Sequence, residues 1–216
     1  MSFLAWAYSL DFQLQQLINQ AGSRPWLDPL MARVSDLNSF LIPLIVAGIA
    51  TVIWGGFRGR LFLVLMAACL LFGEGVFDKH LKEFIHRPRP FQAEAHVRMV
   101  DLGGVKESTP EPTTKGRSFP SGHTINNVAL AMIGCAVFGR WALILWPWAM
   151  LVSYSRVYLG NHYPSDVLAS WVLAIAYAYF ICKGAAWLWK KYAPGKCPGV
   201  YARHPLLFPL WQKPTR

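Results

Sequence analysis

Long runs of apolar residues with almost no charge are the main pattern of this chain. Four runs contain no charged residue, and a fifth contains only Glu74. The runs lie at residues 40–57, 61–77, 124–139, 141–155 and 167–182. Each approaches the ~20 residues that cross the hydrocarbon core of a bilayer as a helix. Five such runs leave too little polar surface for a soluble domain, so the pattern predicts an integral-membrane helical bundle with about five spans.

Other segments flank these runs. Within residues 1–38, apolar residues recur at steps of three and four, which predicts an amphipathic helix that either lies in the membrane interface or packs against the bundle. Residues 39–182 form the expected transmembrane domain, interrupted by an extramembrane loop at 91–119 that reads as irregular or partly ordered. Residues 183–216 form a basic, aromatic tail. The predicted fold is therefore all-α, with five to six helices.

The charge balance is strongly basic, with 21 Lys and Arg against 11 Asp and Glu and a net charge of +10. No basic helix or aromatic platform accompanies this charge, so the bilayer rather than nucleic acid is the expected partner. Ten Lys and Arg that belong to no motif described below lie at 58–60, at Arg140 and in the tail. These segments share one side of a five-span arrangement, and the positive-inside bias makes that side cytoplasmic. The opposite side also carries cations, among them Arg87, Arg98, Lys106, Lys115 and Arg117, but several of these are assigned to anion binding or its rim.

Three short polar clusters lie at the edges of the apolar runs. They read K-x6-R-P at 82–90, P-S-G-H at 120–123 and S-R-x5-H-x3-D at 155–166. Even numbers of crossings separate them, so all three are expected on one face of the bilayer. Fixed cations stabilise the oxygens of a phosphoryl group during transfer, and histidines can exchange protons or attack phosphorus. The clusters therefore predict a site that binds and attacks a phosphate ester.

Five residues are candidates for binding the phosphate. Arg89 and Arg156 have planar guanidinium groups suited to bidentate oxygen contacts, and Lys82 adds a third positive charge. Ser121 and Gly122 can offer backbone N–H groups at a helix start, where an anion is also favoured by the helix dipole. The three cations supply the charge that a metal would bring, and the four cysteines have no metal-ligand spacing, so no metal or cofactor is expected.

Together, the three motifs resemble the type 2 phosphatidic acid phosphatase (PAP2) superfamily, which also includes the vanadium haloperoxidases. The resemblance covers residues 82–166. It implies that His162 is the nucleophile and forms a phosphohistidine, with Asp166 holding the far ring nitrogen in the attacking tautomer. It also implies that His123 is the general acid for the leaving group and then the base for water.

The resemblance implies a metal-independent lipid phosphatase. Its substrate would be a lipid phosphate or diphosphate such as undecaprenyl diphosphate, phosphatidylglycerol phosphate, phosphatidic acid or lipid A phosphate. The small chain is most similar to bacterial members, which implies the bacterial inner membrane, and the charge bias places the site toward the periplasm. Two alternatives remain open: a phosphotransferase that uses a lipid hydroxyl as acceptor at the same site, and a non-catalytic lipid-binding or transport protein.

Overall fold

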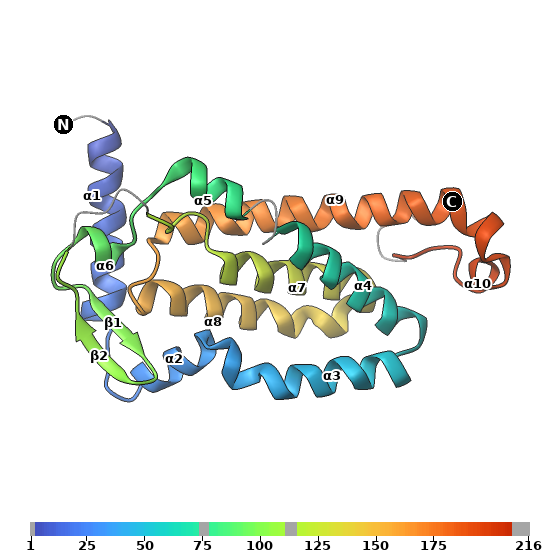
Figure 1. Ribbon diagram of the computed structural model, residues 1–216, viewed down its shortest axis with the longest axis horizontal. Coiled ribbons are helices and arrows are strands. Elements are labelled where there is room, and N and C mark those ends of the chain that lie inside the picture. Colours follow the sequence, from blue (N-terminus) through green and yellow to red (C-terminus); the bar gives the residue numbers. More distant parts are fainter. Residues whose placement is uncertain (1–2, 74–77, 111–115, 209–216) are drawn as a thin grey trace.

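The computed structural model is a bundle of long helices with the N-terminal helix laid across one end (Figure 1). It describes residues 3–73, 78–110 and 116–208. The elements in chain order are α1 (Phe3–Gln16), the π-helical turn η1 (Leu17–Ala21), α2 (Asp28–Ser35), the 3-10 turn η2 (Leu37–Phe40), α3 (Leu41–Trp54), α4 (Gly56–Phe72), α5 (Lys79–Ile85), α6 (Pro90–Ala93), β1 (Arg98–Asp101), β2 (Gly104–Glu107), α7 (Gly122–Phe138), the 3-10 turn η4 (Gly139–Ile144), α8 (Leu145–Tyr158), α9 (Pro164–Lys196) and α10 (Pro198–Arg203).

Helix α7 is the centre of the bundle and packs against α4, α8 and α9. Many of its buried side chains are small, including Ala129 and Ala136, and the neighbouring α9 buries Ala174 and Ala178. Small side chains let helix backbones approach closely, which is how helices associate in lipid without a hydrophobic driving force between them. The core therefore lies along α7, with the other long helices around it.

The outer surface of the bundle is apolar. Helix α3 consists almost entirely of apolar residues but buries none of them completely, and Ile42 on this helix is 74% exposed. A helix at a water-facing surface would instead present a polar face. This surface suits lipid, and the predicted membrane helical bundle is confirmed. The five long helices α3, α4, α7, α8 and α9 coincide in sequence with the five apolar runs.

Helix length and composition alone identify fewer candidate spans than the five apolar runs. Within the described residues, Gly122–Tyr158 and Pro164–Lys196 are long and apolar enough to cross a membrane, and Asp28–Ser35 with Asn38–Trp54 makes a third if that bent pair is one span. The first of these stretches is a hairpin, because α7 and α8 pack side by side in opposite directions (Figure 1). The count of five crossings stays a prediction. Glu74, the charged residue in the apolar run at 61–77, lies outside the described residues.

The N-terminal helix meets the bundle with its polar side. Asp11 and Gln15 on α1, and Asn19 on η1, are buried, whereas Trp6 and Leu17 are exposed. A helix with water on its outer face has the opposite arrangement. The N-terminal segment therefore combines the two alternatives that its sequence left open: it packs on the bundle through polar contacts and presents apolar side chains outward, as an interfacial helix does.

The loop at 91–119 contains more regular structure than its sequence predicted. Strands β1 and β2 form an antiparallel hairpin in which Arg98 pairs with Glu107 and Asp101 pairs with Gly104. Four-residue strands are too short to show a clear alternation of polar and apolar residues, which is why the pattern did not reveal them. The hairpin packs against α2, at the same end of the bundle as α1.

Candidate active site

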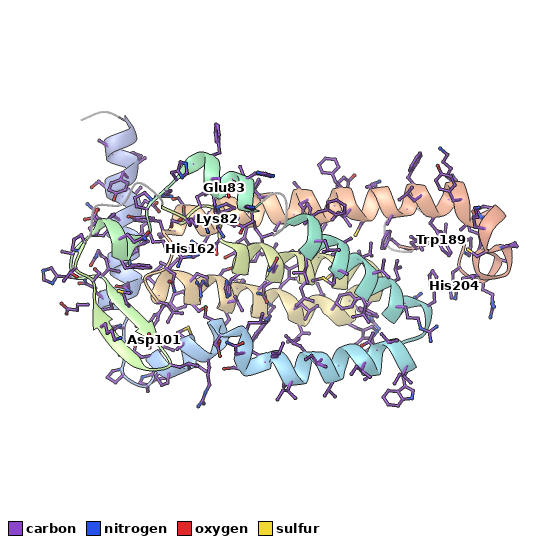
Figure 2. All side chains as sticks on the ribbon, in the orientation of Figure 1. Lys82, Glu83, Asp101, His162, Trp189 and His204 are labelled. Atoms are coloured by element: carbon purple, nitrogen blue, oxygen red, sulfur yellow. The ribbon has the colours of Figure 1, made fainter. Side chains whose placement is uncertain are left out.

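The three motifs meet at one end of the bundle, as their spacing predicted. Lys82 is on α5, His123 is in the first turn of α7, and His162 is on the connection between α8 and α9. Figure 2 shows Lys82 and His162 near this end of the molecule, and Trp189 near the opposite end. Lys82, Arg156 and His162 all lie close enough to His123 to act on its ring electrostatically. Residues far apart in the chain thus form one cluster.

A backbone carbonyl fixes the orientation of the His162 ring. The residue is 3% exposed, and its Nδ1 lies 2.6 Å from the carbonyl oxygen of Ser118. A carbonyl oxygen only accepts hydrogen bonds, so Nδ1 holds the proton and Nε2 keeps its lone pair. Burial lowers the pKa of His162 to about 4, which keeps the ring neutral at pH 7. A neutral ring with an unprotonated Nε2 is the form that a nucleophile requires.

Ser118 connects Asp166 to His162. Asp166 Oδ2 is 3.8 Å from His162 Nδ1, beyond hydrogen-bonding distance. The same Oδ2 accepts hydrogen bonds from Ser118 Oγ at 2.5 Å and from the Tyr163 N–H at 3.0 Å. Asp166 therefore lies beside the predicted ring nitrogen, but the hydrogen bond from Nδ1 goes to the Ser118 carbonyl. Sequence reasoning missed Ser118 because it contributes its main-chain carbonyl, which no side-chain motif encodes.

Arg87 holds the other oxygen of Asp166. Arg87 Nη1 is 2.6 Å from Asp166 Oδ1, and Nη2 is 2.6 Å from Oδ2 of Asp11 on α1. The guanidinium also lies 4.2 Å from the centroid of the Tyr163 ring. The charge of Arg87 is thus matched by two carboxylates, and its place in the site is structural. The acidic partner Asp11 comes from a segment that gave no catalytic signal in the sequence.

Two arginines retain capacity to bind an anion. Arg156 is 8% exposed, and its Nη1 donates to Ser35 Oγ. Its buried Nε has no hydrogen-bond partner in the described part of the chain. Arg89 donates to Asn161 Oδ1 at 3.4 Å. Neither guanidinium forms a salt bridge within residues 3–73, 78–110 and 116–208, and a buried cation without a counter-charge is costly. Both features fit a phosphate between the two side chains.

The remaining phosphate-binding candidates are more constrained. Lys82 Nζ is 2.5 Å from Asp78 Oδ2, so its charge is shared with a carboxylate. Ser121 is the N-cap of α7, but its N–H donates to Ser170 Oγ at 2.8 Å and is not available to a ligand. The predicted role of this N–H in binding phosphate is therefore corrected. Gly122 begins α7 beside Asp78, whose Oδ2 would lie 3.5 Å from an added Cβ.

His123 lies between the cluster and an apolar cavity. Its ring and Ser35 line the same cavity. The cavity has a volume of about 660 Å³ and is lined by His123 and by apolar side chains that include Leu44, Leu70 and Leu130 from α3, α4 and α7. A group that leaves phosphorus toward His123 therefore enters an apolar space. On the other side of Ser35, a polar cleft of about 490 Å³ is lined in part by Arg156 and Asn161.

The cations and two histidines at one end of this membrane helical bundle are the groups that a phosphatase needs to bind and cleave a phosphate ester. The chain belongs to the PAP2 superfamily, whose family model matches residues 58–190. It is 32% identical over 175 residues to phosphatidylglycerophosphatase B of Bacillus subtilis, covering 74% of this chain and 76% of that protein. It is 30% identical over 114 residues to lipid A 4'-phosphatase of Bacteroides thetaiotaomicron, covering 52% of this chain and 48% of that protein.

Two solved structures share the fold. LpxE from Aquifex aeolicus superimposes with a TM-score of 0.61 at 26% identity, covering 81% of this chain and 95% of that chain. The transmembrane PAP2-type phosphatidylglycerolphosphate phosphatase from Bacillus subtilis gives 0.58 at 27% identity, covering 86% and 89%. The predicted family and the predicted enzyme class, a phosphatase, are confirmed. Residues 1–57 lie outside the matched family region, yet they include Asp11 and Ser35, which contact the site.

Proposed function

We propose that this protein is a membrane phosphatase that hydrolyses the phosphomonoester or diphosphate of a lipid through a phosphohistidine formed on His162. The observation that supports it most is the neutral His162 ring, whose proton is on Nδ1, beside two arginines that form no salt bridge with any carboxylate in the described part of the chain. The names of the relatives support a lipid substrate, since they include phosphatidylglycerophosphatase, lipid A 4'-phosphatase and undecaprenyl-diphosphatase.

The first half of the reaction transfers the phosphoryl group to the enzyme. Arg89 and Arg156 hold its equatorial oxygens, on which negative charge accumulates, and Lys82 adds a further positive charge. Nε2 of His162 attacks phosphorus while the bond from phosphorus to the leaving oxygen breaks. The negative charge of the bound phosphate favours the protonated form of His123. His123 then donates this proton to the leaving oxygen, so the lipid leaves as an alcohol, or as a monophosphate if the substrate is a diphosphate.

The second half returns the enzyme to its starting state. Phosphorylation of Nε2 places positive charge on the imidazole, and the Nδ1–H bond to the Ser118 carbonyl stabilises this charge. His123, now neutral, accepts a proton from water as the water attacks phosphorus. The N–P bond breaks, inorganic phosphate leaves, and His162 regains its lone pair.

The apolar cavity gives the lipid chain a place beside the chemistry. Because His123 lines it, the oxygen that His123 protonates lies at the cavity's polar end. A chain attached to that oxygen occupies the space between α3, α4, α7 and α8, among residues suited to hydrocarbon. This arrangement favours substrates whose phosphate lies close to a long apolar chain, such as undecaprenyl diphosphate, phosphatidic acid, phosphatidylglycerol phosphate and lipid A phosphate.

Phosphate release from a panel of these lipids tests the proposal. The purified protein is assayed in detergent with EDTA present, with and without a lipid alcohol as acceptor, and His162→Ala prepared in the same way is the control. We expect release that persists in EDTA and is inhibited by orthovanadate, which occupies the same cationic site. Activity that requires a divalent ion would contradict the metal-independent mechanism. Transfer to the alcohol without free phosphate would identify a phosphotransferase, and no turnover of any lipid phosphate would contradict the proposal altogether.

A further inference from the structure

A continuous series of contacts joins the N-terminal helix to the His162 ring. Asp11 on α1 is 7% exposed, and its Oδ2 is 2.6 Å from Arg87 Nη2. Arg87 Nη1 is 2.6 Å from Asp166 Oδ1. Asp166 Oδ2 accepts from Ser118 Oγ at 2.5 Å, and the Ser118 carbonyl accepts from His162 Nδ1 at 2.6 Å. Each side chain in the series is held on both sides.

Asp11 also fixes the start of the helix that carries Asp166. Its Oδ1 accepts from the backbone N–H of Ser165 at 2.9 Å, and its Oδ2 accepts from Ser165 Oγ at 2.5 Å. The first N–H groups of a helix have no partner within the helix, and an acceptor near them also complements the helix dipole. Asp11 therefore acts as a cap that α1 supplies to the first turn of α9, one residue before Asp166.

We propose that Asp11 is a positioning residue for the nucleophile, acting through Arg87 and Asp166 on the Ser118 carbonyl that orients His162. The inference rests on the proposed function, because it needs His162 to be the attacking group. It assigns a role in the reaction to α1, which lies outside the region matched by the family model. On this view the N-terminal helix is a part of the catalytic apparatus in addition to being a lipid-facing element.

Asp11→Asn removes the charge while keeping the size of the side chain. We expect kcat to fall about 10- to 100-fold, as small displacements of a reacting group do. KM should change much less, because Arg89 and Arg156, which bind the phosphate, make no contact with Asp11 in the described structure. Asp11→Glu keeps the carboxylate and should recover part of the lost kcat. A rise in KM with an unchanged kcat would overturn the proposal.

Asp28→Asn is a matched control from the same N-terminal segment. Asp28 is also a buried carboxylate, 2.7 Å from Arg98 Nη2, and it accepts a hydrogen bond from Tyr158, but it makes no contact with Asp166. Loss of this ion pair in Asp28→Asn should lower thermal stability about as much as Asp11→Asn does. It should leave kcat close to that of the unmodified protein. Equal losses of kcat in Asp11→Asn and Asp28→Asn would show a general packing effect and overturn the proposal.

A double-mutant cycle tests whether Asp11 acts through Asp166. If both lie on one route to His162, Asp11→Asn combined with Asp166→Asn should have the same kcat as Asp166→Asn alone. Fully multiplicative losses would show that the two residues act independently and would overturn the proposal.

The ring tautomer of His162 gives a readout that needs no turnover. ¹⁵N NMR of the labelled protein in detergent should show the Nδ1–H tautomer of His162 in the unmodified protein and in Asp28→Asn, and a mixture of tautomers in Asp11→Asn. An unchanged His162 signal in Asp11→Asn would overturn the inference. Failure of the unmodified protein to hydrolyse any lipid phosphate would instead count against the proposed function, and the two failures are thereby distinguished.

Discussion

The two histidines of the site have different surroundings, and the difference separates their roles. His162 is buried, and its Nδ1 is bonded to the carbonyl of Ser118, so its ring has one orientation and one tautomer. His123 is exposed and lines the apolar cavity. A fixed ring suits attack on phosphorus, and a ring that faces the space for the substrate suits proton exchange with the leaving group and with water.

Replacement of each histidine should therefore have a different result. We expect His162→Ala and His123→Ala each to lower turnover by at least ~10²-fold. After exposure to ³²P-labelled substrate for a time matched to the turnover of each variant, and an alkaline quench, a phospho-enzyme should be trapped in the unmodified protein and in His123→Ala but not in His162→Ala. His96→Ala, at an exposed position paired with Glu107, is the control. Labelling of His162→Ala would show that another residue is the nucleophile.

The pH dependence of phosphorylation should reflect the burial of His162. Protonation of Nε2 blocks attack, and burial lowers the pKa of His162 from 6.5 to about 4. The unprotonated ring therefore persists as the pH falls. After correction for ionisation of the substrate, kcat/KM should decrease toward low pH with a midpoint near pH 4, where His162 becomes protonated. Stopped-flow measurement of phospho-enzyme formation between pH 3.5 and 8 checks this. A midpoint near 6.5 would indicate an ordinary, solvated imidazole.

At the scale of helices and strands, Gly160 allows the β1–β2 hairpin to pack closely against the connection between α8 and α9, beside the site. Gly160, on the connection from α8 to α9, has a φ of +75°. A Cβ added there would lie 2.6 Å from the carbonyl oxygen of Arg98 and 2.9 Å from Val97 Cγ1. The hairpin formed by β1 and β2 thus lies directly against the segment that presents His162, and only a residue without a side chain allows this spacing.

Gly160→Ala should therefore destabilise the active-site end. The left-handed backbone alone costs an L-residue about 1–3 kcal/mol, and the contact with Arg98 adds to that cost. We expect a lower thermal midpoint in detergent and reduced kcat, measured on the same preparation. Gly184→Ala on α9 is the control, because a Cβ there meets no atom within 4 Å and alanine favours a helix interior. Equal midpoints for the two variants would contradict this account.

The sequence predicted the parts of the structure that local pattern and side-chain chemistry encode. The long helices followed from apolar runs, and the meeting of Arg89, Arg156 and His162 followed from the motifs at their ends. The contributions of Ser118 and Asp11 were not predictable in this way. Ser118 acts through its main chain, and Asp11 reaches the site only because α1 crosses the end of the bundle, an arrangement that depends on packing between distant segments.

At the scale of the whole molecule, the distribution of charge predicts how the bundle is oriented in the membrane. The loop at 58–60, Arg140 and the C-terminal tail hold cations that belong to no catalytic motif. Such residues resist transfer across the membrane when their loops are short. The active-site end lies at the other end of the α7–α8 hairpin, so we propose that it faces the periplasm.

Cysteine labelling of intact cells tests this orientation. Leu102, at the exposed tip of the β1–β2 turn, and Trp141, exposed on the α7–α8 connection, mark opposite ends of the bundle. In a background without the partly exposed Cys135 and Cys197, an impermeant thiol reagent should label Leu102→Cys in intact cells and Trp141→Cys only after lysis. The reverse pattern would place the site in the cytoplasm.

The length of helix α9 bears on how deep Asp166 and the neighbouring His162 lie relative to the headgroups. Asp166 is in its first turn, and Trp187 follows about 30 Å further along the axis at ~1.5 Å per residue. That distance matches the ~30 Å hydrocarbon thickness of a bilayer. Trp187, with Lys191 Nζ 4.8 Å from its ring centroid, belongs at the opposite headgroup level. We therefore expect a thicker bilayer to draw His162 toward the acyl chains and a thinner one to raise it into the aqueous layer. Membrane thickness would then set how far a lipid phosphate must move to meet the proposed nucleophile.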